Sequence, residues 1–217
     1  DADQGFILLA GGRSNLTGSP SPSEDWTFIM LDREGAVGWG PLAGPRWNHT
    51  LTHLPLADGS NGAIVLVGGE NASGALASAE RFTIPKVGLG TNPSLVADGT
   101  GTMAGGPHTM HAAVYVPEAD AVYVIGGFSD AAHAAATNAI EVYTAGSRQW
   151  QGPLPLDLAR GAPAAVLMDG STILISGGVD GNGAVLNSVA MILNASTAPQ
   201  AIGGQAPTMA SARAGHA

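Results

Sequence analysis

The sequence predicts an all-β fold built from repeated antiparallel sheets of four strands. Three observations lead to this prediction. Short apolar runs end in a Gly-Gly pair at four places, these pairs recur at similar intervals, and glycine and proline together make up about a fifth of the 217 residues. Glycine permits positive φ angles and proline sets turn corners, so both suit short strands joined by tight turns, whereas long helices tolerate them poorly.

The four Gly-Gly runs are predicted to be strands because they are rich in β-branched and other apolar residues. Their second glycines follow one another at intervals of 57, 58 and 51 residues, and the runs span 6–12, 63–69, 121–127 and 172–178. A period near 50 residues accommodates one four-stranded sheet per repeat.

Each repeat is predicted to hold further strands in phase with the Gly-Gly run. A strand that precedes the run, joined to it by a hairpin turn, is expected at 49–52, 111–116 and 163–168. A third strand, after a polar loop, is expected at 26–31, 79–84, 139–143 and 188–193. A fourth strand is marked by Trp39 and Trp150. The first repeat lacks its innermost strand, and Arg213 and His216 open a fifth repeat.

Recurring polar residues complete the pattern. Arg46, His108 and Arg160 stand three residues before the first strands, and His49, His111 and His216 recur at one repeat position. The order of Arg-x-x-His, an apolar strand, a strand ending in Gly-Gly, a strand such as Glu141-Val142-Tyr143, and then Trp150 resembles the kelch repeat. The second repeat departs from this pattern because it lacks the Trp, and the fourth departs from it because Pro163 stands in place of the His.

The resemblance covers essentially the whole chain and implies a kelch-type β-propeller. About four blades of four antiparallel strands are visible, and because kelch families usually have six or seven blades, the chain is interpreted as part of a larger six- or seven-bladed ring. The expected boundaries are a partial blade 1–45, three blades at 46–104, 105–157 and 158–209, and the start of the next blade at 210–217.

Charge and composition limit the kinds of partner and site that we expect for this chain. The net charge is −9, and Lys86 is the only lysine, so neither nucleic acid nor an anionic membrane is an expected partner. The chain has no cysteine, which excludes disulfides, zinc–thiolate sites and cysteine nucleophiles within this span. No apolar run reaches the length of a membrane-spanning segment.

Four Asn-x-Ser/Thr sequons predict N-linked glycans, at Asn15, Asn48, Asn71 and Asn194. They indicate a secreted protein or an extracellular cell-surface protein. In a kelch blade the first three would share one face and Asn194 would lie on the opposite face. We therefore expect protein partners to dock elsewhere on the ring or on its sides.

No catalytic, cofactor-binding or metal site is expected. His108 and His111 are three residues apart, but at the start of a strand their recurrence explains them better than metal binding. Arg46, Arg160 and Arg213 either hydrogen-bond within their own loops or bind an anion in the central mouth. Glu80 and Glu141 match the acidic position of the kelch third strand. The segment 180–183 is predicted to be a turn, because it lacks the full signature of a calcium loop.

The predicted function is a non-catalytic extracellular module for protein binding or for structural assembly, including partners in a larger complex. One alternative is a fragment of a secreted copper enzyme similar to galactose or glyoxal oxidase, whose site lies outside this span. That site needs a Cys cross-linked to Tyr, and here Tyr115, Tyr123 and Tyr143 all lie in strand runs. The other alternative is an intracellular kelch adaptor, which the sequons and the absence of a BTB-like helical segment disfavour.

Overall fold

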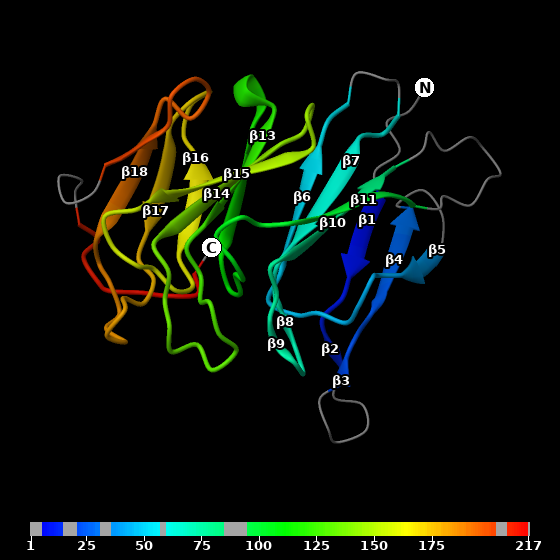
Figure 1. Ribbon diagram of the computed structural model, residues 1–217, viewed down its shortest axis with the longest axis horizontal. Helices are drawn as coiled ribbons and strands as arrows, with labels where there is room; N and C mark the ends of the chain where they lie inside the picture. The colour runs from blue at the N-terminus through cyan, green and yellow to red at the C-terminus, as the bar shows by residue number, and fades with distance from the viewer. Residues whose placement is uncertain are drawn as a thin grey trace. The chain divides into compact units, whose positions relative to one another are not determined.

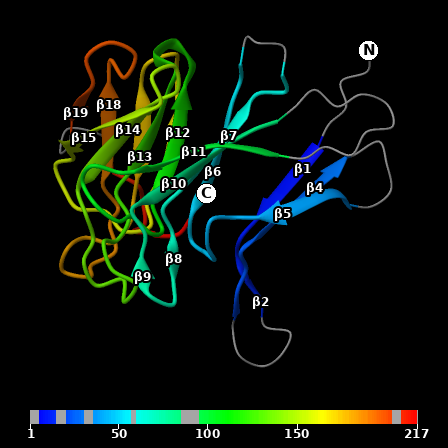
Figure 2. The same ribbon diagram turned by 45° about the vertical axis from the view of Figure 1, so that its right-hand side comes forward.

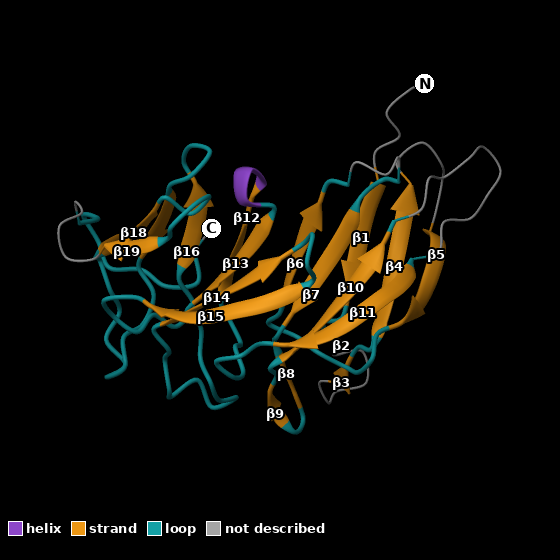
Figure 3. Ribbon diagram, turned by 45° about the horizontal axis from the view of Figure 1, so that its top comes forward, coloured by secondary structure: helices purple, strands orange, loops and turns teal. Residues whose placement is uncertain are grey.

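The computed structural model describes residues 6–14, 21–30, 36–56, 60–84, 95–202 and 208–216. These residues form an all-β fold of several antiparallel sheets, as the sequence predicts (Figure 3). The helical structure in this described part is a single 3-10 turn, η1 (Pro117–Ala119), in the hairpin between two strands of the third repeat.

Each repeat forms its own sheet (Figure 1). The first sheet has three described strands, β1 (Phe6–Ala10), β4 (Asp25–Met30) and β5 (Ala36–Pro41). The second has β6 (Thr50–Leu54), β7 (Ala63–Val67), β10 (Ser78–Thr83) and β11 (Val96–Thr102). The third has β12 (Ala112–Val116), β13 (Ala121–Ile125), β14 (Ala139–Thr144) and β15 (Gln149–Pro155). The fourth has β16 (Ala164–Leu167), β17 (Ile173–Ser176), β18 (Val189–Leu193) and β19 (Gln200–Ile202).

Two of the differences between the predicted and the observed strands lie next to the Gly-Gly pairs or the first strands. The first strands of repeats two to four begin one residue later than expected, because each is preceded by a residue with left-handed φ, namely Asn48, Met110 and Ala162, followed by one linking residue. Two of the loops after Gly-Gly pairs contain short hairpins, β2 (Arg13–Ser14) with β3 (Ser21–Pro22) and β8 (Glu70–Asn71) with β9 (Gly74–Ala75).

The chain divides into two compact units. The first comprises Asp1–Trp47, His53–Val65 and Glu80–Thr100, and the second comprises Asn48–Thr52, Leu66–Ala79 and Gly101–Ala217. In the first unit, buried Trp26 of β4 covers its cross-strand partner Gly40 so closely that a Cβ atom there would lie 2.6 Å from the indole ring.

The core of the second unit lies between the third and fourth sheets, which are side by side in Figures 1 and 2. Val114, Tyr123 and Val142 form a cross-strand row on the third sheet. This row belongs to one buried cluster with residues of the fourth sheet, chiefly Ile173, Ile175, Ala190 and Ile192. The alternation of the strands therefore points one apolar face of each sheet at the other.

The Gly-Gly pairs form the junctions between successive repeats. In all four pairs the first glycine has φ between 59° and 61° and the second between 86° and 102°, which only glycine adopts easily. The second amide donates to the carbonyl oxygen of the residue at the Arg/His position of the next repeat, at 2.8–2.9 Å for Gly12–Arg46, Gly69–His108, Gly127–Arg160 and Gly178–Arg213. A Cβ atom on Gly126 would lie 2.4 Å from the Arg160 carbonyl oxygen, so the junction requires glycine there.

A second recurring contact runs between the left-handed residues of the second unit. Met110 N donates to Asn48 O, Ala162 N to Met110 O, and Gly215 N to Ala162 O, at 2.9–3.0 Å. These four residues have φ between 47° and 62°. From repeat two onward, successive repeats are thus joined by backbone hydrogen bonds at two places.

Candidate functional site

Two side chains at the recurring Arg/His position, those of Arg160 and His108, hydrogen-bond the backbone of their own repeats. Arg160 is fully buried, and its Nη1 donates to Gly177 O at 2.9 Å and to Ser188 O at 3.1 Å. His108 Nδ1 makes the equivalent bond to Gly126 O at 2.7 Å. Burial lowers the pKa of His108 and that of Arg160. Both side chains hold the carbonyl oxygen of the first junction glycine.

The acidic residue near the recurring Arg/His position differs from repeat to repeat. Buried Arg46 donates from Nη2 to Glu80 Oε1 at 2.7 Å, and Glu80 Oε2 also accepts the Ala43 amide at 2.8 Å. Burial lowers the pKa of Arg46, and the Glu80 charge opposes that shift. The first unit therefore contains a desolvated ion pair in which both partners are hydrogen-bonded.

In repeat three the acid remains but the arginine is replaced by His108. Glu141 is fully buried and accepts the amides of Ala104 at 3.2 Å and Gly105 at 2.6 Å. Burial raises the pKa of Glu141, whereas the two amides oppose the rise. In repeat four the third-strand position is Ala190, and Asp157 of the preceding loop lies 3.9 Å from Arg160 Nη2. In repeat four the acidic residue near the arginine therefore lies in the preceding loop and not on the third strand.

The recurring histidines bond hydroxyl groups. His111 Nε2 lies 2.8 Å from Thr50 Oγ1, and His216 Nε2 lies 2.9 Å from Ser176 Oγ. Burial lowers the pKa of His111 to about 3, and repulsion from His108 adds to the shift. The rings of His108 and His111 meet edge to face at 6.2 Å. Within the described residues, no group of three or more His, Asp or Glu side chains is arranged to hold a metal ion.

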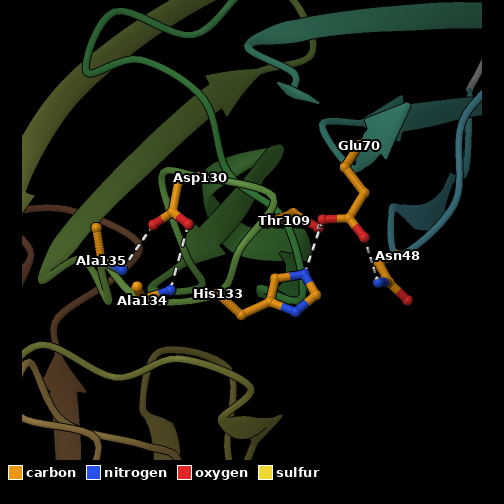
Figure 4. A network of polar contacts seen from close by, with 7 residues as sticks. All are labelled: Asn48, Glu70, Thr109, Asp130, His133, Ala134 and Ala135. Carbon is orange, nitrogen blue, oxygen red and sulfur yellow. Dashed lines mark hydrogen bonds and ion pairs between the residues drawn. The ribbon is translucent and has the colours of Figure 1, made fainter. Parts of the chain in front are cut away.

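A buried carboxylate network is the feature that sequence reasoning missed (Figure 4). Glu70 directly follows a junction glycine and is 3% exposed. Its Oε1 accepts a hydrogen bond from Asn48 Nδ2 at 3.0 Å, and its Oε2 accepts from Thr109 Oγ1 at 3.1 Å and from His133 Nε2 at 2.7 Å. Glu70 is the only acid that directly follows a Gly-Gly pair in this sequence, and that signal was available without the structure.

This network connects three segments of the second unit. Asn48 precedes β6, Thr109 precedes β12, and His133 lies in the loop between β13 and β14 with φ of 54°. The carboxylate orients the imidazole with Nε2 toward it, and the His133 ring also lies 5.3 Å from the Phe128 ring. The network therefore connects these loops through a single buried carboxylate.

The predicted glycosylation residues lie in different settings. Asn48 donates its amide to Glu70, as described above. Asn71 ends β8 in a short hairpin, where its Oδ1 accepts the Ser73 amide at 2.8 Å. Asn194 follows β18, is exposed and has φ of 55°. Asn15 lies outside the described residues.

Three aspartates stabilise their own turns. Asp180 Oδ1 accepts the amides of Asn182 at 2.8 Å and Ala184 at 2.9 Å. Such backbone bonds lower the pKa of Asp130, Asp169 and Asp180. The segment 180–183 is accordingly a turn whose carboxylate is engaged by backbone amides.

The second unit also has a cavity of about 370 Å³. Its walls come from β13, β14 and β15 of the third sheet and from residues 195–199, which follow β18. Tyr123 forms part of the wall, and its hydroxyl donates to Ala195 O at 2.6 Å. Burial raises the pKa of Tyr123. This volume lies within the usual range of small-molecule sites.

Comparisons with known proteins bear on the fold alone. No family model matches the chain, and no curated protein matches it. A solved structure titled "Structure of YjhT" is similar, with a TM-score of 0.57 and 12% sequence identity over 93% of this chain and 67% of that chain. In the described part of the chain, no helix has the length and apolar character needed to cross a membrane.

Proposed function

We propose that this chain is a segment of a kelch-type β-propeller that acts as a non-catalytic, glycosylated extracellular module for protein binding or assembly. The observation that carries the proposal is the use of its recurring polar side chains. Arg46, His108, Arg160, Glu80 and Glu141 are all bonded within the repeats or to the loops that lead into them. Residues used in this way build a scaffold and leave its loops for recognition.

Packing on the fourth sheet supports the propeller arrangement. Val166, Leu174 and Met191 form a cross-strand row on the face opposite the buried core. The matching row of the third sheet is covered by the fourth sheet, whereas Val166 is 55% exposed. Residues 208–216 already make the junction bonds Gly178–Arg213 and Gly215–Ala162 at this edge. These contacts suit a further blade against the apolar row.

Two of the tyrosines in this span have structural partners of their own, so a copper site of the alternative kind would have to draw its ligands from outside the span. Tyr115 donates its hydroxyl to Asp120 Oδ1 at 3.0 Å, and Tyr123 donates to Ala195 O. Desolvation, together with the hydrogen bond to Asp120, raises the pKa of Tyr115 to about 12. Both hydroxyl groups are thus donated within the protein.

The extracellular assignment rests on the sequons, and mass spectrometry tests it. The protein is secreted from a eukaryotic host with its full natural chain, and its intact mass is measured before and after glycosidase treatment. Glycan mass on the Asn71 and Asn194 peptides is the expected result. A chain that is secreted with both peptides unmodified contradicts the glycoprotein part of the proposal.

The proposed docking surface has its own test. Cross-linking of the protein to its purified partner, followed by peptide mapping, should place the contacts away from the β8–β9 hairpin that bears Asn71. Cross-links concentrated beside Asn71 would contradict this placement while leaving the scaffold assignment intact.

A further inference from the structure

The cavity of the second unit has walls of two kinds. Its apolar part is formed by small and aliphatic side chains, including Ala121, Leu154 and Ala195, and its polar part by Thr144, Gln151 and Thr197. A β-bulge in the pairing of β14 with β15, between Ile140 and Val142, lies beside it. Bulges commonly occur beside binding sites, where they redirect side chains.

The lining excludes ionic ligands. None of the eleven lining residues is Asp, Glu, Lys, Arg or His. An ion placed there would lose hydration without gaining an opposite charge, which is strongly unfavourable. The hydroxyl groups of Thr144 and Thr197 and the amide of Gln151 instead suit a neutral ligand that carries hydroxyl or amide groups and has an aliphatic side.

The size suits a single sugar unit. The volume of about 370 Å³ lies toward the small end of the range of small-molecule sites, which is about 300–1,000 Å³. Tyr123 is the only aromatic residue in the lining, and its ring is buried with its hydroxyl held by Ala195 O. Without an exposed aromatic face for stacking, a free sugar would be held weakly.

A predicted glycosylation residue, Asn194, is adjacent in the chain to the lining of this cavity. Asn194 immediately precedes the lining residue Ala195, and its carbonyl oxygen accepts the amides of Thr197 and Ala198, each at 3.0 Å. Asn194 therefore begins the same hydrogen-bonded turn that contains the lining residues Ala195 and Thr197, and the lining residue Pro199 follows that turn. A sugar attached to Asn194 would have an effective concentration in the millimolar range or above, which offsets a weak intrinsic affinity.

We infer that the cavity between β13–β15 and residues 195–199 is a binding site for a neutral N-acetylated sugar, and that its occupant is the first sugar of a glycan on Asn194. This inference rests on the proposed glycosylation of the protein. The docked sugar joins the loop after β18 to β14 and β15 of the neighbouring sheet, so modification and inter-sheet packing are coupled.

The test uses the secreted, glycosylated protein, with Asn194 occupancy measured by peptide mass spectrometry. Nuclear Overhauser contacts are then sought between the N-acetyl methyl group of the first sugar and the methyl groups of Ala121 and Ala195. An endoglycosidase that leaves one sugar on Asn194 should preserve these contacts. Ala119→Leu, which adds volume at the cavity wall, should abolish them without lowering occupancy, whereas Asn71→Gln should leave them unchanged.

The possible failures are distinguishable. If Asn194 is occupied but no contacts to Ala121 or Ala195 are seen, this inference is overturned and the glycoprotein assignment stands. If Asn194 is unmodified, both fail at this site. Methyl N-acetyl-β-glucosaminide added to the Asn194→Gln protein should perturb the same methyl signals only at millimolar concentrations. Tight binding of that probe, without contacts in the glycosylated protein, would overturn the tethered occupant in favour of a free ligand.

Discussion

Phe128 and Gly161 lie so close that a Cβ atom on Gly161 would be 2.0 Å from Cζ of the Phe128 ring. Phe128 directly follows a Gly-Gly pair, and Gly161 directly follows Arg160 of the next repeat. The corresponding pair in repeats two and three is Glu70 with Thr109, which are joined by a hydrogen bond. In repeats one and two the pair is Arg13 with Trp47, and the guanidinium group lies 4.6 Å from the centre of the Trp47 ring. The chemistry of each pair differs, but the position is the same.

Gly161→Ala should therefore destabilise the protein by overpacking, by about 1–3 kcal/mol in urea unfolding. Phe128→Leu in the same chain should recover part of the loss, because a smaller side chain makes room for the methyl group. Gly181→Ala is the matched control, since nothing lies within 4 Å of a Cβ there, and it should change stability by less than about 0.5 kcal/mol. Equal effects at both glycines would contradict the packing argument.

Removing Glu80 should cost far more than removing Asp157. Glu80→Ala leaves the Arg46 guanidinium buried without its carboxylate, since their side chains are only 3% and 4% exposed, and the expected loss is about 3–5 kcal/mol. Asp157 is partly exposed and 3.9 Å from Arg160, so Asp157→Ala should cost at most about 1 kcal/mol. Denaturant midpoints at constant m-value measure both. A small loss for Glu80→Ala would show that the pair is not desolvated.

Stability should fall as the pH drops below about 6.5, because of His111. Its folded pKa of about 3 lies below the unfolded value of 6.5, so in the window between them the unfolded state binds a proton that the folded state does not. The free energy of unfolding then decreases toward acid by up to about 1.4 kcal/mol per pH unit. His111→Gln should remove this contribution between about pH 6.5 and pH 4.5.

Two comparisons separate burial of His111 from other contributions to the slope. Thr50→Val removes the hydroxyl that His111 contacts but retains the buried imidazole, so the slope should persist. Glu141 acts in the opposite sense, because burial raises its pKa and its protonation favours the folded state. The difference between wild type and His111→Gln cancels that contribution. Parallel curves for the two proteins would refute the assignment.

Asn48→Asp should destabilise the Glu70 network by about 1–3 kcal/mol at pH 7. It replaces a donor 3.0 Å from the buried Glu70 carboxylate with a second carboxylate. The loss should shrink toward acid pH, because the introduced carboxyl group can then take up a proton and donate a hydrogen bond to Glu70. Asn71→Asp is the control, since an aspartate there can still accept the Ser73 amide. Thermal unfolding across pH measures both, and similar losses for the two variants would contradict the network's role.

Much of the fold was readable from local patterns. The apolar and β-branched content of the Gly-Gly runs identified β1, β7, β13 and β17, and the hairpin signals identified their neighbours. β11 and β19 lack a marking Trp, yet they form the fourth strands of their sheets. Their places were expected from the repeat, since backbone pairing along an open edge does not require a particular side chain.

The side-chain contacts were less accessible from the sequence. The junction Arg and His residues recur in phase, so their structural use was one of the two readings weighed. The Glu70 contacts to Asn48, Thr109 and His133 span 22, 39 and 63 residues, and the Tyr123–Ala195 bond spans 72. Positions such as those of Asn48 and Thr109 recur along the chain, but the side chains that fill them differ from repeat to repeat, so the contacts were not predicted.

The order of residues was thus sufficient to establish an all-β chain of repeated sheets whose junctions need glycine, because strand alternation and positive φ are local properties of the backbone. Which side chains meet across the junctions, and where a cavity is left between two sheets, was decided by the packing of whole sheets. That packing depends on the volume and charge of residues far apart in the chain, for which the sequence contains no local signal.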